Sequence, residues 1–82
     1  GIGQIGFYEG QTFDEWNGDL ICTASKYGLL IKLDYEQNKI VKKEVLIKND
    51  IGRIRDFEID KKGDIFIIID ERDAALWKLS NK

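Results

Sequence analysis

The sequence predicts an all-β chain built from antiparallel sheets. Short apolar runs rich in Ile, Leu, Val and aromatic residues alternate with turn sequences, and none continues with helical spacing. The 82 residues include no proline, and the eight glycines fall between the runs, where they permit tight turns. With 43% hydrophobic and 34% charged residues, the composition is that of a globular protein.

Six segments have the length and composition of strands, and turn sequences separate them. "DYEQN" lies between the second and the third, and "DKKGD" lies between the fourth and the fifth, with Gly63 suited to a positive φ. The expected strands are 19–25, 28–34, 39–47, 53–59, 64–70 and 74–80. The residues before 17 have no strand pattern, and we expect them to be irregular.

Two copies of one pattern occur in the chain. "NGDLI…GLLIKLD" matches "KGDIF…AALWKLS", so that Gly18 and Gly63 are 45 residues apart and Lys32 and Lys78 are 46 apart. A repeat of about 40–50 residues with roughly four strands is typical of a β-propeller blade. We therefore predict antiparallel four-stranded blade-type sheets in a partial β-propeller of fewer than two blades.

Residues 1–47 would form one partial blade and residues 48–82 a second. The predicted strand 64–70 is apolar on both faces from Ile65 to Ile69, which is typical of a strand covered on both sides by neighbouring sheets. Two partial blades cannot provide that cover for each other. We therefore expect a homo-oligomer in which exposed blade strands find partners in another copy.

Charge and composition argue against several classes of function. The net charge of −2 comes from 13 basic and 15 acidic residues that are interspersed, which disfavours binding to nucleic acid or to an anionic membrane. No apolar run reaches the roughly 18 residues of a membrane span. The absence of histidine removes the commonest general base. The lone Cys22 lies in the apolar run "LICTA" and should be buried, and "DKKGD" and "DERDA" are turns, not cation-binding loops.

The stretch "NDIGRIRDFEID" places two arginines at the start of the fourth predicted strand. Because side chains alternate along a strand, Arg53 and Arg55 should point to one side and Ile54 to the other. Two interpretations remain open. One is a solvated strand face with pairing to a neighbouring Asp56 or Glu58. The other is an anion site, since guanidinium groups bind carboxylates in two-point contacts.

The chain resembles the soluble quinoprotein glucose/sorbosone dehydrogenases. "FYEGQTFDEWNGDLICTASKYGLLIKLD" and "IGRIRDFEIDKKGDIFIIIDE" carry this resemblance, which covers residues 7–80, and "RIRD" followed by the Gly-Asp turn is its most specific part. The family consists of six-bladed propellers that oxidise aldose sugars with pyrroloquinoline quinone (PQQ). The chain therefore looks like the C-terminal segment of such an oxidoreductase.

The resemblance implies that Lys26, Arg53 and Arg55 face the PQQ cofactor. Cations there would neutralise its carboxylates and stabilise the negative charge that develops on the quinone oxygens. Without the resemblance, Lys26 would be read as a solvated turn lysine. The family's catalytic histidine is absent, and its calcium ligands lie, by resemblance, in earlier blades. We therefore expect no catalytic or metal-ligating residue here and no activity from the chain alone.

The resemblance also implies that the parent enzyme acts on a sugar in the periplasm or outside the cell. The alternative is a non-catalytic ligand-binding or scaffold propeller, because a fold does not determine a function. Trp16 and Trp77 are expected to pack at blade junctions and not to stack on a ligand.

Overall fold

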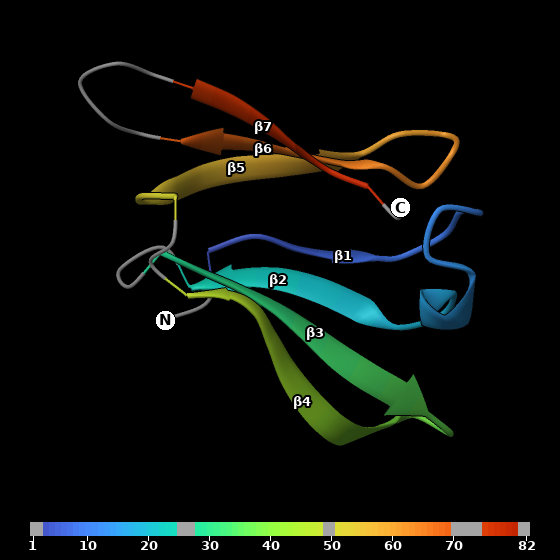
Figure 1. Ribbon diagram of the computed structural model, residues 1–82. Coiled ribbons are helices and arrows are strands. Elements are labelled where there is room, and N and C mark those ends of the chain that lie inside the picture. Colours follow the sequence, from blue (N-terminus) through green and yellow to red (C-terminus); the bar gives the residue numbers. More distant parts are fainter. Residues whose placement is uncertain (1–2, 25–27, 49–50, 70–74, 81–82) are drawn as a thin grey trace.

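A computed structural model describes residues 3–24, 28–48, 51–69 and 75–80 (Figure 1). These residues form two antiparallel sheets and one short 3-10 helix, which confirms the predicted all-β class. The first sheet has the strand order β1-β2-β3-β4, and the second has the order β5-β6-β7. Among the described residues, no helix has the length and apolar character needed to cross a membrane.

All six predicted strands are present, with ends within two residues of the predicted ones. The strands are β1 Ile5–Phe7, β2 Leu20–Ala24, β3 Leu29–Glu36, β4 Lys39–Lys48, β5 Ile54–Ile59, β6 Ile65–Ile69 and β7 Ala75–Leu79. The expectation of irregular structure before residue 17 is wrong for two short segments. Ile5–Phe7 pairs with β2, and the 3-10 helix η1 covers Asp14–Trp16. The first sheet is therefore a complete four-stranded blade.

The hydrophobic core lies between the two sheets, which form two layers in Figure 1. Alternation along β6 directs Ile65, Ile67 and Ile69 to one face, where they are buried together with Ile21 and Leu30 of the first sheet. Burying apolar side chains on both facing layers is the main stabilising contribution to such a two-layer fold.

A β-bulge interrupts the pairing of β5. Ile54 and Asp56 pair with adjacent residues of β6, which leaves Arg55 as an extra residue. Because of this extra residue, Ile54 and Phe57 both point into the core although they are three positions apart. The bulge therefore gives this short strand an apolar inner face together with the exposed Arg55.

Tyr8 connects the two sheets at the end where β1 and β5 finish. Its hydroxyl donates a hydrogen bond to the carbonyl oxygen of Gly63 (2.6 Å) and accepts one from the amide of Phe13 (3.0 Å). The backbones come so close here that a Cβ on Gly10 would lie less than 3.0 Å from the Cα of Gly63. Gly63 also has a φ of +106°, as predicted from the turn sequence.

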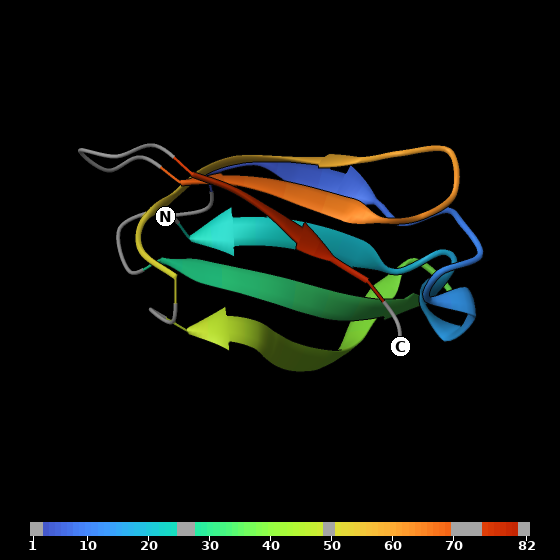
Figure 2. The ribbon, with the colours of Figure 1, turned by 45° about the horizontal axis from the view of Figure 1, so that its top comes forward.

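A second connection joins the edge strands β1 and β5, which lie side by side in Figure 2. The side-chain amide of Gln4 donates to the carbonyl oxygen of Phe57 (3.0 Å) and accepts from the amide of Phe57 (3.1 Å). Since β1 and β5 are each the first strand of a sheet, the two sheets meet along corresponding edges, as neighbouring propeller blades do.

The repeat found in the sequence appears in the structure as a shared register. Cys22 pairs with Ile31 in the first sheet, and their counterparts Ile67 and Trp77 pair in the second. A shift of 45 residues relates β2 to β6, and a shift of 46 relates β3 to β7, along the whole length of both pairs. The two sheets are therefore structural copies of one unit.

The two tryptophans differ in their surroundings. Trp16 packs against the core as predicted, and its ring stacks on Phe13 with 4.1 Å between ring centroids. Trp77 is 49% exposed, so the prediction that it packs at a junction is not met within the described residues. The reason is that the sheets touch near β1, β2 and β5 and separate toward β4 and β7 (Figure 1).

Candidate cofactor-binding edge

Arg53 and Arg55 lie on the edge of the second sheet that adjoins β1. Arg53 immediately precedes β5, and Arg55 is the extra residue of the bulge. Both side chains are exposed, whereas Ile54 between them is fully buried. The structure therefore places both arginine side chains outside the apolar core.

In the part of the chain that the structure describes, neither guanidinium group forms an ion pair or a hydrogen bond. The predicted partner Asp56 instead accepts a hydrogen bond from the backbone amide of Phe57 (2.8 Å). Two exposed arginines without a partner among the described residues keep their N–H donors available for an external anion. A planar carboxylate matches their fork geometry best.

Lys26, the third predicted cation, lies outside the described residues. The strands that flank it are described, and Ala24 pairs with Leu29 at the end of the β2–β3 hairpin. Leu29 also pairs with Lys48, the last residue of β4, and the next strand, β5, begins at Ile54. The end of β2, the start of β3 and the start of β5 therefore lie at the same end of the molecule (Figure 1).

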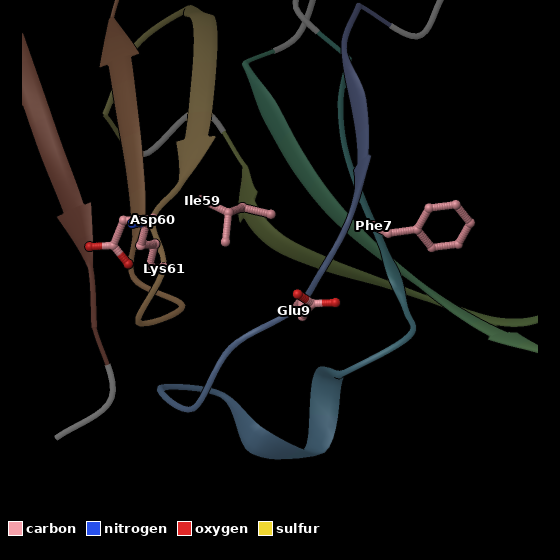
Figure 3. A pocket seen from close by; sticks show the side chains of 5 residues that line it. All are labelled: Phe7, Glu9, Ile59, Asp60 and Lys61. Atoms are coloured by element: carbon pink, nitrogen blue, oxygen red, sulfur yellow. The ribbon is translucent and has the colours of Figure 1, made fainter.

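A hollow of about 330 Å³ lies at the opposite end of β5 (Figure 3). It is lined by Phe7, Glu9, Ile59, Asp60 and Lys61, and the ring of Phe7 points away from the other four side chains. One oxygen of Asp60 already accepts the backbone amides of the three residues at positions 62–64. With two carboxylates and one ammonium group, this hollow does not suit a polyanion. Within the described ranges, no group of three potential metal ligands occurs.

The profile of the family described as "Glucose / Sorbosone dehydrogenase" matches residues 1–78. The chain belongs to this family. Two solved structures, "Crystal structure of glucose dehydrogenase" and "glucose dehydrogenase", each share 33% sequence identity with it and superpose with a TM-score of 0.88. Each match covers 100% of this chain and 24% of the other, so the chain spans about a quarter of their length. No match was found among curated protein sequences. The predicted resemblance and the β-propeller fold are confirmed.

This dehydrogenase-family segment also contains a buried ionic cluster that the strand pattern did not predict. Lys32 is 5% exposed, and its ammonium group pairs with Asp34, with Asp19 (3.5 Å) and with Glu44 (3.8 Å). The ammonium group also lies 5.8 Å from the ring centroid of Trp16. Burial alone would lower the pKa of Lys32, but the three carboxylates outweigh it and raise that pKa.

The second sheet of the segment repeats this arrangement in a simpler form. Lys78 pairs with Asp64 at 3.2 Å, and Thr12 donates a hydrogen bond of 2.6 Å to the same carboxylate. The hydrogen bond from Thr12 contributes most to lowering the pKa of Asp64, and Lys78 adds to it against the effect of burial. The repeat offsets of 45 and 46 residues relate Asp19 to Asp64 and Lys32 to Lys78. This repeat is the sequence signal that could have drawn attention to the pairs Asp19–Lys32 and Asp64–Lys78.

Proposed function

We propose that the chain is a segment of a PQQ-dependent aldose sugar dehydrogenase in which Arg53, Arg55 and Lys26 bind the cofactor. The observation that carries the proposal is the pair of exposed guanidinium groups on the β5 edge, which have no partner in the described residues. The carboxylates of PQQ are the kind of anion that such a pair recognises, so the residues present fit this cofactor.

Within this proposal the chain's own residues bind and orient, and they perform no proton transfer. When bound, PQQ supplies the two-electron acceptor for sugar oxidation. Arg53 and Arg55 would each donate two parallel N–H bonds to carboxylate oxygens, which fixes the plane of the ligand. The positive charge of Lys26 would favour negative charge on the oxygens nearby.

The catalytic base and the calcium ligands of the parent enzyme would lie outside these 82 residues. The chain has no histidine, and it spans only 24% of the matched structures. We therefore propose that the chain alone is inactive and that the parent enzyme acts in the periplasm or outside the cell. Both solved relatives carry the name glucose dehydrogenase, so glucose is the first substrate to test.

A chimera tests the cofactor role directly. The 82 residues replace the matching segment of the solved glucose dehydrogenase, and PQQ affinity is measured by titration of the apoenzyme. Arg53→Ala or Arg55→Ala should each weaken PQQ binding by roughly 10- to 100-fold, since a hydrogen bond between charged groups contributes about 1.5–3 kcal/mol.

Lys61→Ala is the matched control, because Lys61 is an exposed cation at the far end of the same strand. It should leave PQQ affinity unchanged. Equal affinities for all three variants would refute the assignment of the arginines. Separately, measurable oxidation of glucose by the purified 82-residue chain with PQQ and calcium would refute the claim that the base lies elsewhere.

A further inference from the structure

Gln4 connects the two sheets next to the bulge of β5. It directly precedes β1, which lies beside β5 in Figure 2. Its side-chain amide donates to the carbonyl oxygen of Phe57 (3.0 Å), and its side-chain oxygen accepts the amide of Phe57 (3.1 Å). A carboxamide carries a donor and an acceptor side by side, as a peptide group does. The side chain of Gln4 therefore bonds the outer edge of β5 as a residue of a neighbouring strand would.

The backbone of Gln4 is in turn fixed to the first sheet. Its amide donates to the hydroxyl of Thr23 (3.0 Å), and its carbonyl oxygen accepts the amide of Thr23 (3.0 Å). Thr23 is 1% exposed and lies in β2, next to the last residue of that strand, Ala24. Because its backbone is bonded to β2 and its side chain to β5, Gln4 fixes the position of β5 relative to β2.

The contact with Phe57 lies close to the extra residue of the bulge. The described register passes from the pair Ile54–Ile69 directly to the pair Asp56–Ile68, without a partner on β6 for Arg55. Bulges of this kind change the direction of a side chain. Gln4 bonds the backbone two residues after Arg55, at the edge of β5 that faces β1. The direction of the Arg55 side chain therefore depends on how Gln4 holds this part of β5.

Asp56 binds the same backbone amide but cannot replace Gln4. Its carboxylate accepts a hydrogen bond from the amide of Phe57 (2.8 Å), and it belongs to β5 itself. An ionised carboxylate has no donor for the Phe57 carbonyl oxygen, and this bond does not reach the first sheet. Loss of the Gln4 amide would therefore leave the Phe57 amide with a partner and would release β5 from β2 at this point.

We infer that Gln4 is a positioning residue that sets the direction of Arg55 toward the cofactor, an inference that rests on the proposed PQQ site. The proposed cations come from both sheets, since Lys26 lies in the sequence between β2 and β3 and Arg55 lies in β5. A rigid polyacid is bound by both only when the two sheets have the correct relative position. Gln4 acts through Arg55 and does not itself contact the cofactor.

PQQ titration of the apo form of the chimera described above tests this inference. Gln4→Met keeps the length of the side chain and removes its donor and acceptor, so it should weaken PQQ binding by roughly 3- to 10-fold. Gln4→Glu directs a carboxylate at the Phe57 carbonyl oxygen and should weaken binding at least as much. Gln11→Met is the matched control, since Gln11 is exposed and the structure describes no hydrogen bond of its side chain. It should leave PQQ affinity unchanged.

A double variant separates positioning of Arg55 from a general loosening of the chain. When Arg55 is already alanine, Gln4→Met should weaken PQQ binding further by less than about 2-fold, because the two changes affect one interaction. The same loss in both backgrounds would mean that Gln4 acts independently of Arg55, and it would overturn the inference. Gln4→Glu takes the place of Gln4→Met in this comparison if the methionine variant does not fold.

The single variants distinguish a failure of this inference from a failure of the proposed function. If Arg55→Ala leaves PQQ affinity unchanged, the proposed function fails and the role of Gln4 fails with it. If Arg55→Ala weakens PQQ binding and folded Gln4→Met does not, the inference alone is overturned.

Discussion

The Tyr8 hydroxyl lies 2.6 Å from the carbonyl oxygen of Gly63, and this hydrogen bond joins the two sheets across 55 residues of sequence. Tyr8 is 1% exposed, so water does not replace the bond if it is broken. Burial raises the pKa of Tyr8 above its ordinary value of 10.0, so the phenol can still donate this bond in moderately alkaline solution. The same hydroxyl accepts the amide of Phe13, so one atom satisfies two backbone groups.

Tyr8→Phe should therefore lower the free energy of unfolding by about 1–3 kcal/mol, because it leaves a buried donor and a buried acceptor without partners. Urea denaturation followed by circular dichroism measures this change. Tyr35→Phe is the control, since Tyr35 contributes a ring contact with Phe7 and no hydroxyl hydrogen bond that the structure describes. Equal losses for the two variants would contradict the role assigned to Tyr8.

The close approach of Gly10 to Gly63 gives a second prediction. A methyl group on Gly10 would collide with the Gly63 backbone, which cannot rotate away as a side chain can. Gly10→Ala should therefore destabilise the chain by about 1–3 kcal/mol or more, as overpacking does. Gly6→Ala is the matched control, because no atom lies within 4 Å of its added Cβ. Thermal unfolding of both variants measures the difference, and a Gly10→Ala protein as stable as Gly6→Ala would disprove the close contact.

Asp64 makes stability depend on acid pH. The pKa of Asp64 in the folded chain lies below the ordinary value of 3.8. The ionised carboxylate therefore adds its full contribution to the free energy of unfolding above that pH, and this contribution is lost as the pH falls through the folded pKa. Asp64→Asn should be less stable than the parent at pH 7, and the difference should shrink below about pH 4. Unfolding by urea at pH 3, 5 and 7 measures this trend. A difference that is the same at all three pH values would argue against an ionised Asp64.

Lys32 has the opposite pH dependence. The pKa of Lys32 in the folded chain is raised above 10.5. Its contribution to the free energy of unfolding is therefore present below that pH and is lost as the pH rises through the folded pKa. Lys32→Met should lower the free energy of unfolding by less than the ~3–5 kcal/mol that is lost when a fully buried ion pair is broken. The reason is that the partners Asp34 and Glu44 are partly exposed. Lys78→Met should lower the free energy of unfolding by a smaller amount than Lys32→Met, since Lys78 is about half exposed. Urea midpoints at pH 7 rank the variants, and the reverse order would refute the buried cluster.

Much of this fold could be predicted from the sequence, because the six longer strands carry apolar runs bounded by turn residues. β1 was not predicted, because it has only three residues with Gly6 at its centre. Its pairing with β2 depends on tertiary contacts and not on a local sequence pattern. The bulge at Arg55 was not predicted either, since a strand predicted from sequence is assumed to alternate strictly. The contact of Tyr8 with Gly63 depends on the packing of the two sheets, which no local pattern encodes.

The candidate site was less accessible to sequence reasoning. Alternation predicted that Arg53 and Arg55 point to one side and Ile54 to the other, and in the structure both arginines are exposed whereas Ile54 is buried. Their role toward a cofactor came only from the family resemblance, because an exposed arginine pair looks the same whether it binds water or a ligand. The 45- and 46-residue offsets relate Asp19 and Lys32 to Asp64 and Lys78, and the ion pairs at these positions became visible only in the structure.

The bulge also separates two requirements on this segment during evolution. Removing Arg55 or Asp56 would place Ile54 and Phe57 two positions apart, and strict alternation would then direct both side chains into the core. The apolar interior therefore accepts this stretch with or without the extra residue. Homologous chains that lose the residue at position 55 should keep both apolar side chains and lose one of the two exposed arginines.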